Sequence, residues 1–166
     1  MVAVHYFTAY ADWIPSESRK RHRQYVKALR STGVEVHFGK FKCRTSRCKK
    51  CSSSWDSHEE KRSDVNLALA MVFEAVQDRY DKALVLTGDT DIVPAIQMVR
   101  SAPFNKAVTA LIPKRRKANS NELQQAASAT VSLTEAVAGR CLFPDRVQAA
   151  DGSLIVERPL AYAPSP

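Results

Sequence analysis

The sequence predicts a three-layer α/β/α sandwich with a mainly parallel central sheet. Short apolar runs rich in β-branched residues alternate along the chain with segments whose apolar residues recur at helical spacing. This order is typical of parallel sheets covered by helices. Residues 83–86 form an apolar run without polar alternation, as expected of a strand that is buried on both faces.

Length and composition are those of one globular domain. The chain has 166 residues, of which 45% are hydrophobic and 25% are charged. It contains no apolar run of the ~20 residues that a membrane span needs and no signal peptide, so we expect a cytoplasmic protein without a membrane partner. The net charge of +8 and the pI of about 9.5 favour a polyanion partner, although a basic surface also promotes solubility.

The first third of the chain predicts two strands around one helix. Residues 2–8 are apolar and β-prone. Ser16 is expected to cap a basic helix over residues 17–32, which ends at Gly33. Residues 34–38 alternate apolar and polar side chains, as in a strand near a sheet edge.

The rest of the chain continues the alternation of helix and strand. Residues 65–76 are apolar around most of the helix circumference, which predicts a largely buried helix. Further elements are expected as follows: a strand over 83–86, a helix over 92–101, a strand over 106–112, a basic loop over 113–117, a helix capped by Asn119, a strand over 131–133 and a brief helix ending at residue 139.

Two acids, Asp89 and Asp91, follow the strand over 83–86 at its carboxyl end, where open α/β sheets bind their ligands. Carboxylates one residue apart repel each other at neutral pH unless a cation lies between them. The alternative is structural, with Asp89 forming an Asx turn and Asp91 capping a helix. Asp64 has the same two interpretations, a helix cap or a carboxylate directed at this edge of the sheet.

Three cysteines, Cys43, Cys48 and Cys51, lie in a lysine- and arginine-rich stretch that continues as a polar loop to His58. The neighbouring cations are expected to lower the thiol pKa values. Cys48 and Cys51 have the spacing of a zinc knuckle, with Cys43 as third ligand and His37 or His58 as fourth. The alternative is a set of loop cysteines without metal.

Four segments together resemble the NYN domain family of PIN-like, metal-dependent ribonucleases: His5-Tyr-Phe-Thr-Ala9, Gln24-Tyr-Val-Lys-Ala-Leu29, Glu59-Glu-Lys-Arg-Ser-Asp-Val-Asn-Leu-Ala68 and Thr87-Gly-Asp-Thr-Asp91. The resemblance implies an NYN domain over residues 1–145 with a cysteine-rich insertion at 40–58, followed by a C-terminal extension over 146–166. It also implies that Asp64, Asp89 and Asp91 hold Mg²⁺ or Mn²⁺.

The implied chemistry is hydrolysis of RNA. Clustered carboxylates would hold one or two divalent ions that polarise the scissile phosphate and supply the hydroxide nucleophile. Five basic residues are expected to contact the RNA backbone at the same edge: Lys61, Arg62, Lys114, Arg115 and Arg116.

The sequence departs from the family pattern in one respect. NYN domains open with a central strand that carries an Asp-x-x-Asn motif, whereas residues 2–8 match the second strand. We expect the position of this first strand to be filled by an upstream segment, by a separate polypeptide or by a strand exchanged between copies in a homo-oligomer. Two other functions stay open: a catalytically degenerate RNA-binding or regulatory protein, and an interaction module that accepts a partner strand by β-augmentation.

Overall fold

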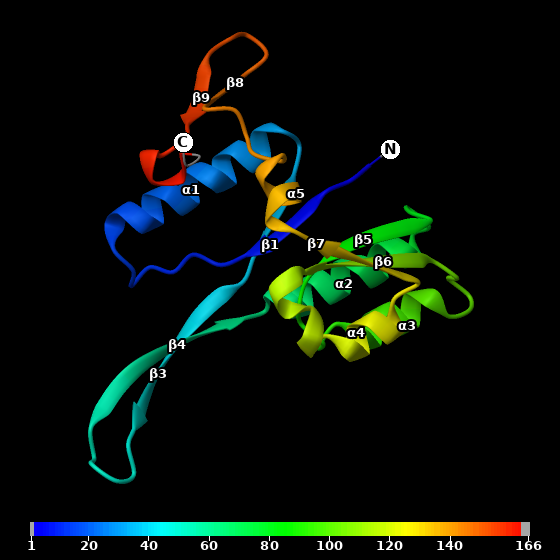
Figure 1. The fold of residues 1–166 in the computed structure, drawn as a ribbon, viewed down its shortest axis with the longest axis horizontal. Coiled ribbons are helices and arrows are strands. Elements are labelled where there is room, and N and C mark those ends of the chain that lie inside the picture. The colour runs from blue at the N-terminus through cyan, green and yellow to red at the C-terminus, as the bar shows by residue number, and fades with distance from the viewer. Residues whose placement is uncertain (1, 164–166) are drawn as a thin grey trace. The chain divides into compact units, whose positions relative to one another are not determined.

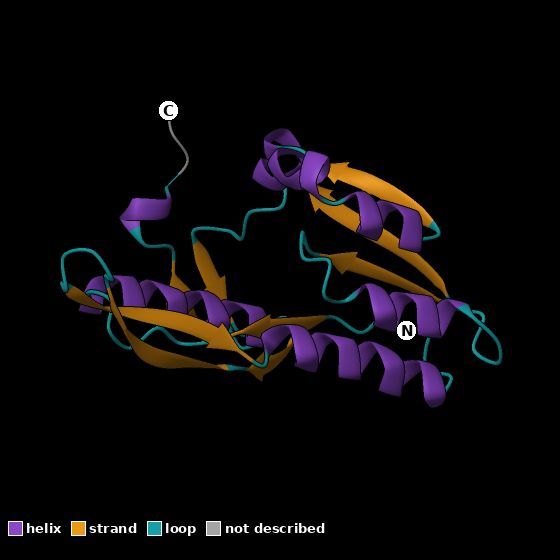
Figure 2. Ribbon diagram, turned by 90° about the horizontal axis from the view of Figure 1, so that it is seen from below, coloured by secondary structure: helices purple, strands orange, loops and turns teal. Residues whose placement is uncertain are grey.

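The computed structural model describes residues 2–163 and divides into two compact units. The first unit contains Met1–Ser63 and Phe143–Pro166, and the second contains Asp64–Leu142. Both units contain helices and strands (Figure 1; Figure 2). No helix within residues 2–163 is long and apolar enough to cross a membrane.

The second unit is built on a parallel three-stranded sheet (Figure 1). Strand β6 (Ala107–Pro113) lies between β5 (Lys82–Leu86) and β7 (Ala129–Leu133). The other elements are α2 (Ser63–Val76), α3 (Val93–Arg100), the 3-10 helix η1 (Lys114–Asn119), α4 (Asn121–Ala126) and α5 (Glu135–Gly139). Helix α4 has Ser120 at its N-cap, so it begins later than the predicted cap at Asn119, whose side chain lies outside the described part of the structure.

One face of this sheet packs against helices, whereas the other is largely exposed along β5. Val85, Val108 and Ile112 on that face join a core with residues from α2, α3 and α4. On the other face Leu84 and Leu86 are 65% and 55% exposed. The prediction that residues 83–86 are buried on both faces is therefore wrong.

Helix α2 is also less buried than predicted. Met71 and Ala75 are buried in the core, but a stripe along the helix is exposed: Val65, Leu69, Phe73 and Val76. These positions recur at helical spacing, so they form one continuous apolar face. Within the described residues of the second unit, nothing covers this face or the outer face of β5.

The first unit pairs β1 (His5–Thr8) in parallel with β2 (Glu35–Phe38). Helix α1 (Ser16–Ser31) connects these strands, and Gly33 follows it with φ of 84°, the left-handed conformation expected after a helix. The segment that begins at Phe143 forms an antiparallel pair, β8 (Arg146–Gln148) and β9 (Leu154–Glu157), and the 3-10 helix η2 (Leu160–Tyr162).

The C-terminal segment is an integral part of the first unit. Val147 and Val156, one on each strand, are buried against Ala28 of α1. Residues 164–166 of the predicted tail lie outside the described residues.

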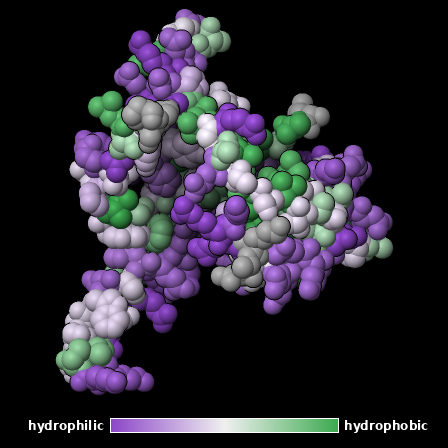
Figure 3. Space-filling model, in the orientation of Figure 1, coloured by the Kyte–Doolittle hydropathy of each residue, from purple (hydrophilic) through white to green (hydrophobic). Residues whose placement is uncertain are grey.

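The cysteine-rich insertion forms an antiparallel hairpin of β3 (Lys40–Arg47) and β4 (Ser54–Lys61). The predicted polar loop up to His58 is therefore wrong, because most of it is strand. The hairpin surface is mostly hydrophilic, with a hydrophobic patch near its tip (Figure 3). At its base, a Cβ atom on Gly39 would lie 2.7 Å from the carbonyl oxygen of Lys61, so only glycine allows this approach.

The mixed α/β class and the parallel pairing are as predicted, but a single central sheet is not observed. The described strands are divided among four small sheets. Within these, β5 pairs with β6 alone, and β1 pairs with β2 alone.

Candidate active site at the carboxyl end of β5

Asp89 and Asp91 lie in one tight turn after β5. The backbone N–H of Asp89 donates to Oγ1 of Thr87 at 3.0 Å, and the N–H of Asp91 donates to Oδ1 of Asp89 at 3.0 Å. The second bond is the Asx turn that the sequence offered as an alternative. Ile92, not Asp91, is the N-cap of α3, and no side chain caps this helix. Both acids are exposed, so their carboxylates are accessible to a ligand.

Asp64 lies at the same end of the second unit. It is in the first turn of α2, and a short connection of residues 77–81 joins the far end of this helix to β5. Met71 and Ala75 pack into the core with Val85, so α2 and β5 run in opposite directions side by side. The start of α2 therefore lies at the end where β5 finishes.

The three carboxylates are near one edge, but their oxygen atoms do not all lie within 4.8 Å of one another. Among residues 2–163, one group of three His, Cys, Asp or Glu side chains has all its ligand atoms within 4.8 Å of one another, and it does not include these acids. Asp64, Asp89 and Asp91 carry only oxygen ligands, the type that Mg²⁺ and Mn²⁺ prefer. The carboxylate oxygens are suitable ligands for such an ion, but the three side chains would have to move closer together to bind one ion jointly.

Basic residues follow β6 at the same edge, because β6 is parallel to β5. Arg116 of η1 packs against the turn: a Cβ atom placed on Gly88 would lie 3.2 Å from Cβ of Arg116. Lys114 and Arg116 are exposed, while Nη2 of Arg115 donates to Oε1 of Glu135 at 2.6 Å. The predicted basic loop is a 3-10 helix.

The other two predicted RNA contacts, Lys61 and Arg62, belong to the first unit. Lys61 forms an ion pair with Glu59. Arg62 is exposed and has a positive φ of 82°.

The four predicted zinc ligands are not brought together. Cys43 lies opposite His58 across the hairpin, whereas Cys48 and Cys51 lie at its turn. No cysteine belongs to a cluster of three metal-binding side chains in the described part of the chain. All four cysteines of the protein are free thiols.

One thiol of the turn is nonetheless activated. Sγ of Cys51 lies 3.0 Å from the hydroxyl oxygen of Ser53. Hydrogen bonds from Ser53, with a smaller contribution from Cys48, lower the pKa of Cys51 to about 7. The sequence predicted a lowered pKa but attributed it to neighbouring lysines and arginines, whereas the cause is hydrogen bonding.

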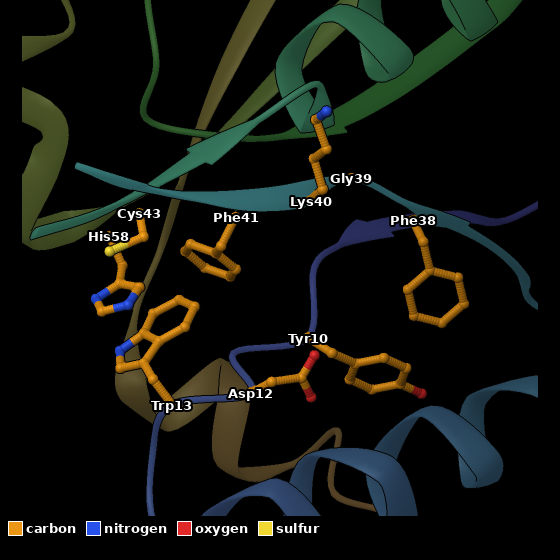
Figure 4. A pocket seen from close by; sticks show the side chains of 9 residues that line it. All are labelled: Tyr10, Asp12, Trp13, Phe38, Gly39, Lys40, Phe41, Cys43 and His58. Atoms are coloured by element: carbon orange, nitrogen blue, oxygen red, sulfur yellow. The ribbon is translucent and has the colours of Figure 1, made fainter.

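The sequence did not predict an aromatic pocket in the first unit (Figure 4). This open cavity of about 630 Å³ is lined mainly by the rings of Tyr10, Trp13, Phe38 and Phe41. Trp13 stacks on His58 with ring centroids 3.8 Å apart and an interplanar angle of 9°. The only sequence signal was the density of aromatic residues on segments far apart in the chain, and their convergence depends on the tertiary fold.

A parallel β-α-β unit with exposed aspartates after a strand is the arrangement expected of a metal-dependent, PIN-like nuclease domain. The NYN domain family matches residues 2–134, and the chain belongs to this family. NYN and other PIN-like nucleases generally use divalent metal ions.

A curated protein is similar over a short stretch. The chain is 51% identical over 43 residues to the 6-hydroxy-3-succinoylpyridine 3-monooxygenase HspA of Pseudomonas putida (strain DSM 28022 / S16). This match covers 26% of the chain and 14% of the length of that enzyme. No solved structure matches the chain.

Proposed function

We propose that the protein is a cytoplasmic, divalent-metal-dependent ribonuclease whose site lies at the carboxyl end of β5. The observation that carries the proposal is the turn in which Oδ1 of Asp89 accepts the N–H of Asp91. This bond holds two exposed carboxylates on one turn, and Asp64 begins a helix at the same end of the unit. Membership of the NYN family supports a nuclease function for these acids.

Asp64, Asp89 and Asp91 would hold Mg²⁺ or Mn²⁺. The bound ion would polarise the scissile phosphate and activate the attacking water. The remaining carboxylate oxygens would orient that water. Because phosphodiester hydrolysis then needs no nucleophilic side chain, the absence of serine, cysteine or histidine from this turn does not oppose the proposal.

The RNA backbone would lie along η1. Lys114 and Arg116 are exposed there, and Arg116 is positioned by its contact with Gly88. Arg115 would exchange its ion pair with Glu135 for a phosphate, since both partners are largely exposed and such a pair is weak. Lys61 and Arg62 are proposed as further phosphate contacts.

We also propose that a further strand pairs with the free edge of β5. Leu84 and Leu86 are exposed on this strand, and backbone groups on its free side have no strand partner in the described sheet. In the three-layer sandwich that the sequence predicts, such a strand would be central, and the exposed face of α2 would also be covered.

A second candidate is an RNA-binding protein without cleavage activity. The spacing of the three carboxylates favours it, and so does the aromatic pocket. Aromatic rings beside a lysine, here Lys40, are suited to stacking single-stranded bases near a phosphate. The third candidate, a module that accepts a partner strand, depends only on the free edge of β5.

One assay separates the three. Labelled single-stranded RNA is incubated with the protein and Mg²⁺ or Mn²⁺, and binding is measured in parallel at several salt concentrations. A nuclease cleaves the RNA and is inhibited by EDTA. Salt-sensitive binding without cleavage identifies the second candidate, and the absence of both leaves the third.

A further inference from the structure

The two strands β1 and β2 bring together three side chains that are separate in the sequence. Strand pairing places His5 beside Glu35 and Phe7 beside His37. Because side chains alternate along a strand, all four lie on the same face of the two-stranded sheet. Tyr6 and Thr8 point the other way, where they contact Tyr25 and His22 of α1.

The atoms that converge are strong metal ligands. Nδ1 of His5 lies 3.0 Å from Nε2 of His37. The same two nitrogen atoms lie 3.6 Å and 3.4 Å from the carboxylate oxygens of Glu35. These are the three side chains whose ligand atoms all lie within 4.8 Å of one another.

These separations match those of ligands around one cation. Zinc binds imidazole nitrogen and carboxylate oxygen at about 2.0–2.2 Å, so two ligands of a tetrahedral ion lie about 3.3 Å apart, and two at a right angle lie about 2.9 Å apart. The observed distances of 3.0, 3.4 and 3.6 Å lie near these values. One ion would thus contact all three side chains with only small side-chain movements.

The surroundings also suit an ion. The side chains of His5 and His37 are 22% and 28% exposed, whereas Glu35 is 66% exposed and open to solvent. The ring of Phe7 stacks on His37 at 4.7 Å with an interplanar angle of 15°, which fixes the orientation of that imidazole. Three protein ligands leave at least one coordination position for water or for an added ligand.

We propose that His5, Glu35 and His37 form a binding site for a divalent transition-metal ion such as Zn²⁺ or Co²⁺. Two imidazoles and one carboxylate select such an ion over Mg²⁺, which prefers oxygen ligands. The site lies in the first unit and shares no residue with Asp64, Asp89 and Asp91 of the second. The proposal of this metal site does not depend on the ribonuclease proposal.

The test is a titration of the full chain with Co²⁺, followed by its visible absorption. The protein carries Cys43→Ser, Cys48→Ser and Cys51→Ser, which removes the hairpin thiols as competing ligands. We expect one Co²⁺ per chain in this background, displaced by Zn²⁺. His5→Gln and His37→Gln should each weaken binding about tenfold or more, since loss of a direct ligand costs at least as much as loss of an outer-shell contact. His22→Gln, a change at a histidine outside the cluster, should bind like the background protein.

A spectroscopic measurement covers the case in which a histidine variant fails to fold. In long-range ¹H–¹⁵N spectra of the background protein, Zn²⁺ should shift the imidazole signals of His5 and His37 and leave those of His22 and His58 unchanged. The proposal is overturned if the background protein binds no Co²⁺, if folded His5→Gln and His37→Gln bind it as tightly as the background, or if Zn²⁺ shifts only His22 or His58. In that case the 3.0 Å contact is an imidazole–imidazole hydrogen bond without metal.

Discussion

The amide of Asp91 donates a hydrogen bond to the carboxylate of Asp89 at 3.0 Å, which makes the two acids parts of one turn. The turn follows β5 directly, and Gly88 within the same loop lies against Arg116. Charge and local structure can be separated here, because the side-chain oxygen of asparagine accepts the same hydrogen bond without carrying a charge. Asp89→Asn therefore tests the charge of this residue while it retains the turn.

The base of the hairpin should be sensitive to any side chain at position 39. In Gly39→Ala, the new Cβ atom would lie 2.6 Å from Oγ of Ser63 and 2.7 Å from the carbonyl oxygen of Lys61. We expect a loss of about 1–3 kcal/mol in the free energy of unfolding, as for other overpacked sites. The measurement is urea denaturation followed by circular dichroism.

Gly139→Ala is the matched control, because no described atom other than those of its chain neighbours and its own helix backbone lies within 4 Å of a Cβ atom at that position, which ends α5. It should be neutral or stabilise the protein by up to about 1 kcal/mol. Equal stability of the two variants would show that the hairpin base is not packed as described.

Cys51 should be the thiol of the turn that reacts at neutral pH. Its pKa of about 7 lies below the ordinary value, so the thiolate forms as the pH rises through about 7, and the alkylation rate should rise with it. Iodoacetamide labelling followed by mass spectrometry gives this profile. Ser53→Ala should move it to higher pH, whereas Ser46→Ala on β3 should not. A midpoint near the ordinary value of about 8.5, unchanged in Ser53→Ala, would contradict the assignment.

Zinc binding by the hairpin remains a prediction. We expect Cys48 and Cys51 to hold about one zinc ion, with Cys43 and His58 as further ligands after the strands adjust. Elemental analysis of protein purified without added metal should show about one zinc fewer per chain in Cys48→Ser than in the wild type. The control is Cys141→Ser, a change at an exposed thiol outside the hairpin, which should keep the zinc content of the wild type. The prediction is wrong if the wild type and Cys48→Ser contain the same amount.

The free edge of β5 should make the isolated chain self-associate or bind an added strand. A peptide group that is buried without a hydrogen-bond partner costs about 1–3 kcal/mol, so pairing the free edge of β5 with another strand is favourable. The exposed side chain of Leu84 gives such a strand an apolar surface to pack on. Light scattering should give a mass above that of a monomer, and Leu84→Lys should reduce it. Met98→Lys, at an exposed apolar residue of α3, should leave it unchanged. A folded monomer in which the β5 amides on both sides of the strand are protected from hydrogen exchange would contradict this prediction. Residues 2–8 would then not correspond to the second strand of the family.

Outside the hairpin and the C-terminal segment, the order of helices and strands could be predicted from the sequence because each element has its own periodicity. Strands β3, β4, β8 and β9 were not predicted. The turn at Asp89 and Asp91 was also predictable, since it depends on residues adjacent in the chain. Contacts between distant segments were not. The pairing of His5 with Glu35 and His37 requires the register of β1 and β2, and the aromatic pocket requires Trp13 to meet the hairpin.

Burial was the least predictable property. An apolar run such as residues 83–86 predicts that its side chains pack against another element. The sequence pattern does not show whether that element is part of the chain. The exposed Leu84 and Leu86 are the clearest example.

The most direct test of the proposed function is cleavage of labelled single-stranded RNA in Mg²⁺ or Mn²⁺. The protein used is one in which a further strand is paired with the free edge of β5. The wild type should cleave, and Asp89→Asn should lose the activity while keeping the circular dichroism spectrum of the wild type. Asp81→Asn, next to the opposite end of β5, should remain active. Full activity of Asp89→Asn, or activity that persists in EDTA, would contradict the assignment of this turn as a metal-dependent ribonuclease site.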